Sequence, residues 1–413
     1  MEGRAVNASE PAVAPPPGNP RFAPVDGLRA VAALAVLVTH TAFISGFNGH
    51  GFPGEVTARL DAGVALFFVI SGFLLYRPFV AARLRGGSGS GGIGIRRYAR
   101  RRILRIVPAY WLALTVLWIW PGLPGMDAHP WVYYGFLQDL RVAWIGGGIA
   151  AAWSLCTEVQ FYLLLPVYAL AVGRLLRDRP VAVQVRAEYG VLAVLAALSL
   201  GARAQSFLDK TPDTVSSTVV GTFSWFALGM ALAVTSARWH AAPVAERPAL
   251  LRLVARRPLV PWAAAAALLV LVTQIGMPVL SLSDYDFSDW IVGFILYGLL
   301  ALCFAAPVML GAPGDAGVPA RVLTLRPVAY VGLISYGIFL WHHPLTGKLT
   351  GVQDWTSHGS FLVYTAVVFA VAATAASVSY FALERPLLRF KDRRPPREDS
   401  AAERERVELA RAV

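Results

Sequence analysis

Charged residues are scarce in this sequence. They make up 15% of the 413 residues, against about 25% in a typical soluble domain. Hydrophobic residues make up 56%, and several apolar runs approach the roughly 20 residues that a helix needs to cross a bilayer. The low charge excludes an ordinary soluble domain and predicts a protein that crosses a membrane several times.

Cysteine and strand-like alternation are nearly absent as well. The only two cysteines, Cys156 and Cys303, lie inside apolar runs, which leaves neither a disulfide framework nor a zinc-binding spacing. The apolar runs do not alternate with polar residues as barrel strands do, so the membrane segments are predicted to be helices. We therefore expect an all-α membrane bundle without a metal site.

Ten apolar segments are candidates for membrane spans. They cover approximately residues 26–46, 60–80, 104–121, 151–172, 188–203, 217–236, 258–276, 289–310, 327–347 and 360–383. Arginine concentrates in alternate loops, above all in 81–105, and after residue 384. By the positive-inside rule this pattern places both termini in the cytoplasm. The net charge of +12 therefore reflects membrane topology rather than nucleic-acid binding.

Composition divides the chain into three regions. Residues 1–20 are rich in proline and alanine and lack an apolar core, so we expect a disordered tail. Residues 21–388 hold all the apolar segments and are predicted to form one membrane domain. Residues 389–413 are strongly charged and are predicted to be a cytoplasmic tail.

The first apolar segment carries ionisable side chains. DGLRAVAALAVLVTH, residues 26–40, contains Asp26, Arg29 and His40. At ~100° per residue, the eleven steps from Arg29 to His40 return to within about 20° of the same helix face, ~16 Å further along the axis. In a helix that runs outward from the cytoplasm, Arg29 lies near the inner boundary and His40 in the outer half.

Two other apolar segments place ionisable residues at a similar depth. Glu158 lies near the outer end of 151–172, and His342 lies near the outer end of 327–347. A charge at the centre of a bilayer costs ~3 kcal/mol or more, so such groups usually face a cavity or a partner. Together with His40, these residues predict one polar site that opens toward the outer face.

Each of these features also has a purely structural explanation. A histidine near a helix end, such as His343, is often only hydrogen-bonded or placed at the membrane interface. Asp26 and Arg29 fit an ion pair at a helix start. The basic run 96–105 would also serve as a topology signal or bind anionic lipid. Ser71, followed by a glycine in 60–80, suits close helix packing better than a nucleophile role.

Taken together, the motifs resemble the acyltransferase-3 family of integral membrane acyltransferases. The resemblance runs in the family's order from about residue 26 to 388. It rests on DGLRAVAALAVLVTH, GVALFFVISGFLLY, RRYARRRILRIVPAYW, WSLCTEVQFYLLLP, LISYGIFLWHHPL and ALERPLL. Departures are the Cys156-Thr157 pair, where small or apolar residues are common, and His343, which doubles the motif histidine. The chain resembles the stand-alone members, such as glycan O-acetyltransferases and macrolide 3-O-acyltransferases, that lack an extra helix and hydrolase-like domain.

The resemblance implies a transfer reaction at the bacterial plasma membrane. An acyl group, most often acetyl, would pass from cytoplasmic acyl-CoA to a hydroxyl of a glycan, glycolipid or macrolide, with no metal. His40 would act as general base or carry the acyl group, and Glu158 would orient its imidazole. The residues expected to bind acyl-CoA are Arg29, Arg97, Arg101, Arg102 and Arg105. Those expected to line the site are Asp26, Ser71, Trp153, Tyr336 and His342.

Two other classes of function stay open at this stage. Intramembrane His, Glu and Arg are also used by proton-coupled transporters and flippases. The absence of an internal repeat and the dense basic loop before 104–121 favour the transferase, since many transporters are built from repeats. A non-catalytic membrane scaffold would leave the outer-half polar residues without a purpose.

Overall fold

The computed structural model describes residues 24–84, 94–208, 214–239, 243–279, 286–311, 317–349 and 358–392. Within these residues every regular element is a helix, which confirms the predicted all-α class. The predicted N-terminal tail, 1–20, and most of the predicted C-terminal tail lie outside the described residues.

Ten long helices carry the ten predicted spans. They are α1 (Pro24–Ile44), α3 (Gly63–Leu84), α4 (Ile95–Ile119), α7 (Trp153–Leu175), α8 (Val181–Leu208), α9 (Val219–Trp239), α11 (Leu259–Thr273), α12 (Phe287–Leu310), α14 (Arg326–Leu349) and α15 (His358–Ser379). Shorter helices connect them: α2 (Gly51–Ala58), α5 (Pro130–Tyr134), α6 (Val142–Ile145), α10 (Ala249–Arg256), α13 (Val318–Leu323) and α16 (Arg385–Leu388).

Not all ten long helices are equally suited to cross a membrane. In the described part of the chain, eight helices are long and apolar enough on their own, and α10 with α11, bent by 93°, would make a ninth. The remaining long helix, α14, is not among them. It packs against α1 and α15, so protein rather than lipid surrounds much of it.

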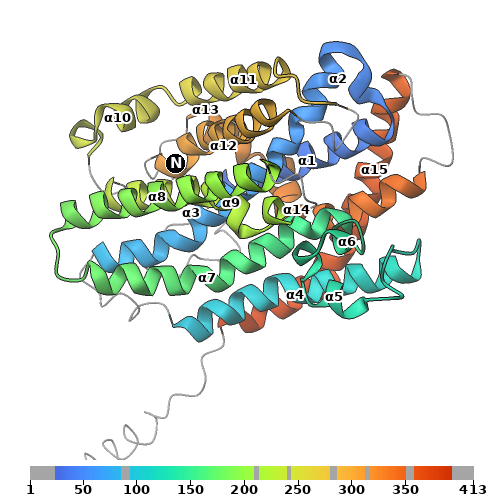
Figure 1. Ribbon diagram of the computed structural model, residues 1–413, viewed down its shortest axis with the longest axis horizontal. Coiled ribbons are helices and arrows are strands. Elements are labelled where there is room, and N and C mark those ends of the chain that lie inside the picture. Colours follow the sequence, from blue (N-terminus) through green and yellow to red (C-terminus); the bar gives the residue numbers. More distant parts are fainter. Residues whose placement is uncertain are drawn as a thin grey trace, which may run out of the picture.

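The connecting segments gather at opposite ends of the bundle. Figure 1 shows the long helices side by side, with α2, α5 and α6 at one end and α10 at the other. Helices α2, α5 and α6 belong to loops predicted to lie outside, whereas α10 belongs to a basic loop predicted to be cytoplasmic. The separation agrees with the predicted alternation of loops. Which end faces the cytoplasm stays a prediction.

The central crossing of α3 and α9 depends on glycine. A Cβ atom on Gly72 would collide with the backbone of Phe226 in α9, and one on Gly229 would collide with the backbone of Val69 in α3. Small residues at such positions let two membrane helices approach to backbone contact. The SG pair at 71–72 therefore packs helices through its glycine, as its sequence predicts, and this leaves the serine free to face elsewhere.

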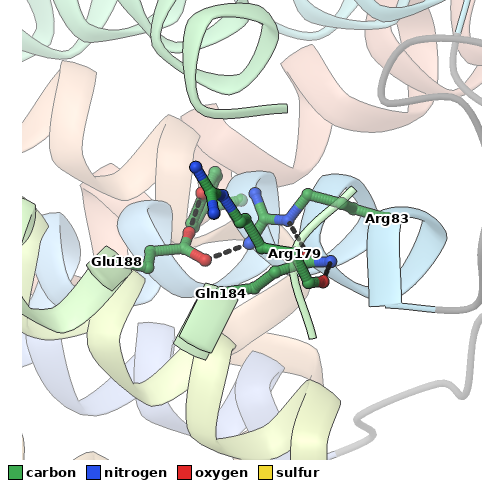
Figure 2. Close-up of polar contacts among 5 residues, drawn as sticks. Arg83, Arg179, Gln184 and Glu188 are labelled. Atoms are coloured by element: carbon green, nitrogen blue, oxygen red, sulfur yellow. Dashed lines mark hydrogen bonds and ion pairs between the residues drawn. The ribbon is translucent and has the colours of Figure 1, made fainter. Parts of the chain in front are cut away.

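A buried polar cluster joins α3 to α8. Glu188 of α8 is fully buried and accepts hydrogen bonds from Arg83 and from the hydroxyl of Tyr76, both on α3. Arg83 Nε also donates to Gln184 Oε1 at 3.2 Å, and Gln184 Nε2 donates to the Arg179 carbonyl at 2.8 Å. Figure 2 shows Arg83, Gln184 and Glu188 close together, with Arg179 beside them. The cluster fixes α8 against the bundle, although only a small part of α8 is otherwise buried.

Candidate active site

A cavity opens between five helices, α1, α3, α4, α7 and α14. The cavity and its mouth hold about 760 Å³ of space free of protein atoms. Its polar lining consists of Arg29, Ser71, Arg102, Arg105, Ser154, Glu158, Tyr162, Ser335 and Tyr336. Helices that lie far apart in the sequence thus contribute polar side chains to one space inside an otherwise apolar bundle.

One wall of the cavity is basic. Arg102 and Arg105 stand three residues apart, which places them on the same face of α4, and Arg29 comes from α1. Arg29 pairs with Asp26 at 3.3 Å and its side chain is 18% exposed, so the expected ion pair at the helix start forms. Arg102 Nε is buried and has no hydrogen-bond partner among the described residues, while its guanidinium lies 5.8 Å from the Tyr162 ring centre. Guanidinium groups gathered on one wall suit an anionic group.

The closing motif of the sequence contributes to this wall. Glu384, from the ALERPLL segment, is 7% exposed and lies close enough to Arg105 to interact with it electrostatically. A buried carboxylate beside an arginine compensates part of its charge. The segment that follows α15 therefore places a carboxylate beside Arg105 of α4 and offsets part of its charge.

Glu158 supplies the carboxylate of the cavity. Its Oε1 accepts a hydrogen bond from the hydroxyl of Ser71 on α3, and the Tyr162 hydroxyl lies within hydrogen-bonding reach of the same side chain. Glu158 and Tyr162 are four residues apart and so share one face of α7. On the opposite side, Tyr336 donates a hydrogen bond to the Ile106 carbonyl at 3.0 Å, which ties α14 to α4 across the cavity.

Two histidines from distant parts of the chain meet next to the cavity. His40 Nδ1 lies 2.8 Å from His342 Nε2, and the two rings stack with centroids 5.1 Å apart and planes inclined by 13°. His342 Nδ1 lies 3.0 Å from the Ile338 carbonyl. His343 contacts the His40 ring edge-on, with centroids 4.9 Å apart.

An aromatic pair separates the histidines from the cavity. Phe67 and Phe339 both line the cavity, and their ring centroids are 6.1 Å apart. Phe339 in turn lies 5.9 Å from His342, ring centre to ring centre. His40 does not line the cavity itself and connects to it through His342 and Phe339.

The structure brings together most of the residues singled out from the sequence. Those that line the cavity are Arg29, Ser71, Arg102, Arg105, Glu158 and Tyr336. Asp26 forms an ion pair with Arg29, and His40 forms a hydrogen bond with His342. Arg97, Arg101 and Trp153 do not belong to the lining; Arg97 is exposed in the first turn of α4. The hydrogen bonds join His40 to His342 and Glu158 to Ser71, rather than His40 to Glu158.

Several lining residues escape sequence reasoning. Ser154 and Tyr162 flank Glu158 at four-residue spacing in α7, and this periodicity could have revealed them. Phe67 and Phe339 are apolar residues in apolar helices, so their sequence carries no signal of a site. In the described part of the chain no group of three or more His, Cys, Asp or Glu could hold a metal ion.

Comparison with known proteins places this site in context. A family model described as an acyltransferase domain matches residues 22–380. The peptidoglycan O-acetyltransferase OatA of Listeria monocytogenes is 22% identical over 388 residues, which cover 88% of this chain and 55% of that protein. The O-acetyltransferase OatA of Staphylococcus aureus is 24% identical over 390 residues, covering 89% of this chain and 58% of that protein. The chain thus spans little more than half the length of these relatives. No solved structure matches.

Proposed function

The chain belongs to the acyltransferase-3 family of membrane acyltransferases, and from this membership we propose that it moves an acetyl group from cytoplasmic acetyl-CoA to a hydroxyl of a cell-envelope glycan. The glycan is favoured over a glycolipid or a macrolide because the relatives named above are O-acetyltransferases, one of them named for peptidoglycan. The protein would act within the bacterial plasma membrane as a multi-pass enzyme.

The observation that supports this proposal is a cavity lined by three arginines and a carboxylate, next to a pair of histidines. Arg29, Arg102, Arg105 and Glu158 all line the cavity, and Phe339 of the lining contacts His342 of the histidine pair. Acetyl-CoA has groups that suit this cavity. Its anionic phosphates can pair with the arginines, and its thin pantetheine arm carries the thioester. Guanidinium groups bind phosphate oxygens with paired hydrogen bonds. The arginines would hold the phosphates while the arm reaches past the phenylalanines toward His40.

The chemistry proposed for His40 is acyl transfer through a basic imidazole. The imidazole takes the proton of the acceptor hydroxyl while the hydroxyl oxygen attacks the thioester carbonyl carbon. The carbon–sulfur bond breaks, and the leaving CoA thiolate takes up the proton as the free thiol. In the second route the imidazole attacks the thioester first, and the acceptor hydroxyl then displaces it from the acyl-histidine. Both routes give one ester and one free CoA.

Glu158 and Ser71 are proposed to act from the cavity side. The Glu158 carboxylate accepts the Ser71 hydroxyl hydrogen bond and lines the cavity. A carboxylate near an imidazole stabilises the imidazolium that forms when the base takes a proton. Since Phe339 lines the cavity and contacts His342, this stabilisation would develop when the thioester arm displaces its ring.

The proposal is tested by transfer of radiolabelled acetyl from acetyl-CoA to glycan in membranes that contain the protein. We expect label in the glycan with the unaltered chain and at least a hundredfold less with His40→Ala, because general base catalysis contributes about 10²–10⁴-fold. Glu158→Gln should fall between the two. The matched control is His129→Ala, an exposed histidine before α5, which should transfer normally.

The outcome for His40 decides between the proposal and its rejection. Normal transfer by a folded His40→Ala protein would contradict the proposed role of that imidazole. Transfer of label to macrolide or glycolipid but not to glycan would correct the acceptor. Label trapped on His40 after rapid denaturation would select the acyl-histidine route.

A further inference from the structure

The hydrogen bonds around the histidine pair carry information about the position of protons. Resting on the proposed function, in which His40 is the reactive imidazole, we infer that His342 is a positioning residue that decides which His40 nitrogen is free to react. His342 fixes a proton on His40 Nδ1 and thereby leaves Nε2 as the base or nucleophile. The role differs from lining the site, which the sequence already suggests for His342.

The direction of the first hydrogen bond follows from its acceptor. His342 Nδ1 lies 3.0 Å from the Ile338 carbonyl oxygen, and a carbonyl oxygen can only accept. Nδ1 of His342 must therefore carry a proton. In a neutral imidazole one nitrogen is a donor and the other an acceptor, so Nε2 of His342 then presents a lone pair.

The direction of the second hydrogen bond follows from the first. His342 Nε2, as an acceptor, lies 2.8 Å from His40 Nδ1, so His40 Nδ1 must donate. His40 is then protonated at Nδ1 and unprotonated at Nε2. The state of one imidazole nitrogen is in general set by the hydrogen bond that the other nitrogen makes. The chain of donors thus runs from His40 through His342 to the Ile338 carbonyl.

The burial of the two rings agrees with these roles, in which His342 positions and His40 reacts. His342 is 0% exposed, and the groups that face it are the Ile338 carbonyl, His40, Phe339 and the edge of His343. No carboxylate is among them, so a charged imidazolium at this position would be costly and the ring is neutral. His40 is less buried than His342, as expected if it is the ring that meets the substrate.

In other histidine-based sites a carboxylate orients the reactive imidazole. Here the neutral ring of His342 has the same role. An orienting partner keeps the imidazole in the tautomer that its reaction requires. Because the partner here is neutral, it fixes the tautomer without adding negative charge. The imidazolium formed during transfer must then be stabilised from the cavity side, where Glu158 lies.

Three variants test the assignment by activity. His342→Leu removes the acceptor for His40 Nδ1 and should lower kcat about a hundredfold with little change in the KM for acetyl-CoA. His342→Gln keeps an acceptor oxygen and a donor nitrogen at similar positions and should recover most of the lost kcat. The matched control is His343→Leu, at the neighbouring histidine, whose contact with His40 is ring to ring; it should retain near-normal kcat.

A spectroscopic measurement tests the assignment without activity. In protein labelled with ¹⁵N-histidine and reconstituted in lipid, solid-state NMR separates protonated from unprotonated ring nitrogens. The His40 signals, identified by their loss in His40→Gln, should show a protonated Nδ1 and a bare Nε2. This measurement uses the unaltered chain, so it decides the question even if His342→Leu does not fold.

Failure of this inference is distinguishable from failure of the proposed function. A protonated Nε2 on His40 in the unaltered chain, or normal kcat in His342→Leu beside an inactive His40→Ala, overturns the role of His342 and leaves the transfer reaction in place. Normal transfer by His40→Ala instead overturns the proposed role of His40 itself.

Discussion

At the scale of single residues, Arg102 combines a place in the cavity lining with a contact to an aromatic ring. Its Nε is buried without a hydrogen-bond partner among the described residues, and it lies over the Tyr162 ring. A buried donor without a partner costs free energy, typically about 1–3 kcal/mol, unless a ligand supplies the acceptor. A phosphate oxygen of the donor substrate would meet this need.

We therefore expect Arg102→Ala to weaken acetyl-CoA binding. Loss of a charge-assisted hydrogen bond of about 1.5–3 kcal/mol should raise the KM for acetyl-CoA roughly tenfold or more, with a smaller effect on kcat. Arg102→Lys keeps the charge but not the planar fork and should fall between. The measurement is initial-rate kinetics, with Arg96→Ala, an exposed arginine of the same helix, as control. An unchanged KM in Arg102→Ala would remove this residue from the donor site.

A second residue, Asp139, lies outside the membrane spans and should make the stability of the protein depend on pH. It lies between α5 and α6, is 0% exposed, and accepts a hydrogen bond from Gln160 Nε2 at 2.7 Å, while its Oδ1 is buried without a partner. Burial raises the pKa of Asp139 to about 7, and the hydrogen bond from Gln160 opposes that rise only in part. The folded protein thus binds a proton that the unfolded chain releases near pH ~4.

The sign of the effect on stability follows from this raised pKa. The contribution is fully present below about pH 4 and is lost as the pH rises through about 7, because the carboxylate must then be charged inside the protein. The unfolding temperature of the unaltered protein should fall between about pH 5 and pH 8. Asp139→Asn should reduce this fall. Thermal unfolding followed by intrinsic fluorescence measures both, and an identical pH profile in the two proteins would contradict the assignment.

At the scale of elements, the buried cluster between α3 and α8 makes a prediction about helix packing. Glu188 is the common acceptor of Arg83 and Tyr76, so its removal leaves a buried guanidinium without its anion. Breaking one side of a buried ion pair typically costs about 3–5 kcal/mol. Glu188→Gln should lower the unfolding temperature clearly, whereas Arg186→Gln, exposed on the same helix, should not.

A double variant separates the ion pair from simple packing. Replacing a complete buried pair by apolar side chains is often neutral, so Arg83→Met with Glu188→Met should recover part of the stability that either single change loses. If the double variant is as unstable as the sum of the two singles, the two side chains do not act as a pair.

The long helices were predictable from sequence because each needs a continuous apolar run, and that signal is local. All ten predicted spans fall on long helices. Short helices such as α2 and α6 were not predicted, since a few turns of mixed composition at a loop give little periodic signal. The break between α10 and α11 falls at Pro258, which is a local signal, whereas the 93° angle depends on how α11 packs on α12.

The meeting of His40 and His342 agrees with the depths predicted from sequence, whereas the neighbours of each side chain around its helix axis were not predictable. Position along a helix gave similar levels for His40, Glu158 and His342, because rise per residue is fixed. Which helices are neighbours depends on packing of the whole bundle, for instance the contact of α1 with α14 rather than with α7. This is why the structure joins His40 to His342 and places Glu158 against Ser71 on α3.

At the scale of the whole molecule, the two ends of the bundle differ in what they offer to a substrate. Arg29 lies near the start of α1, and Arg102 and Arg105 lie in the first half of α4. Helices α2, α5 and α6 gather at one end of the bundle (Figure 1), and the segments that carry them are predicted to be on the outer side. If both termini are cytoplasmic, the basic wall is reached from inside the cell, where acetyl-CoA is made.

This arrangement predicts a sidedness that vesicles can measure. Acetyl-CoA does not cross lipid bilayers, so sealed inside-out vesicles should transfer acetyl from added acetyl-CoA, and sealed right-side-out vesicles should not until they are permeabilised. One cysteine added to a Cys303→Ala background, in which the remaining Cys156 is buried, reports the orientation through an impermeant maleimide. Arg96→Cys on α4 should react only in inside-out vesicles, and Phe52→Cys, half exposed on α2, only in right-side-out ones. If acetyl-CoA were used from the face on which Phe52→Cys reacts, donor entry through the basic wall would be refuted. That result would leave the family assignment untouched, because the assignment does not depend on the direction from which the donor arrives.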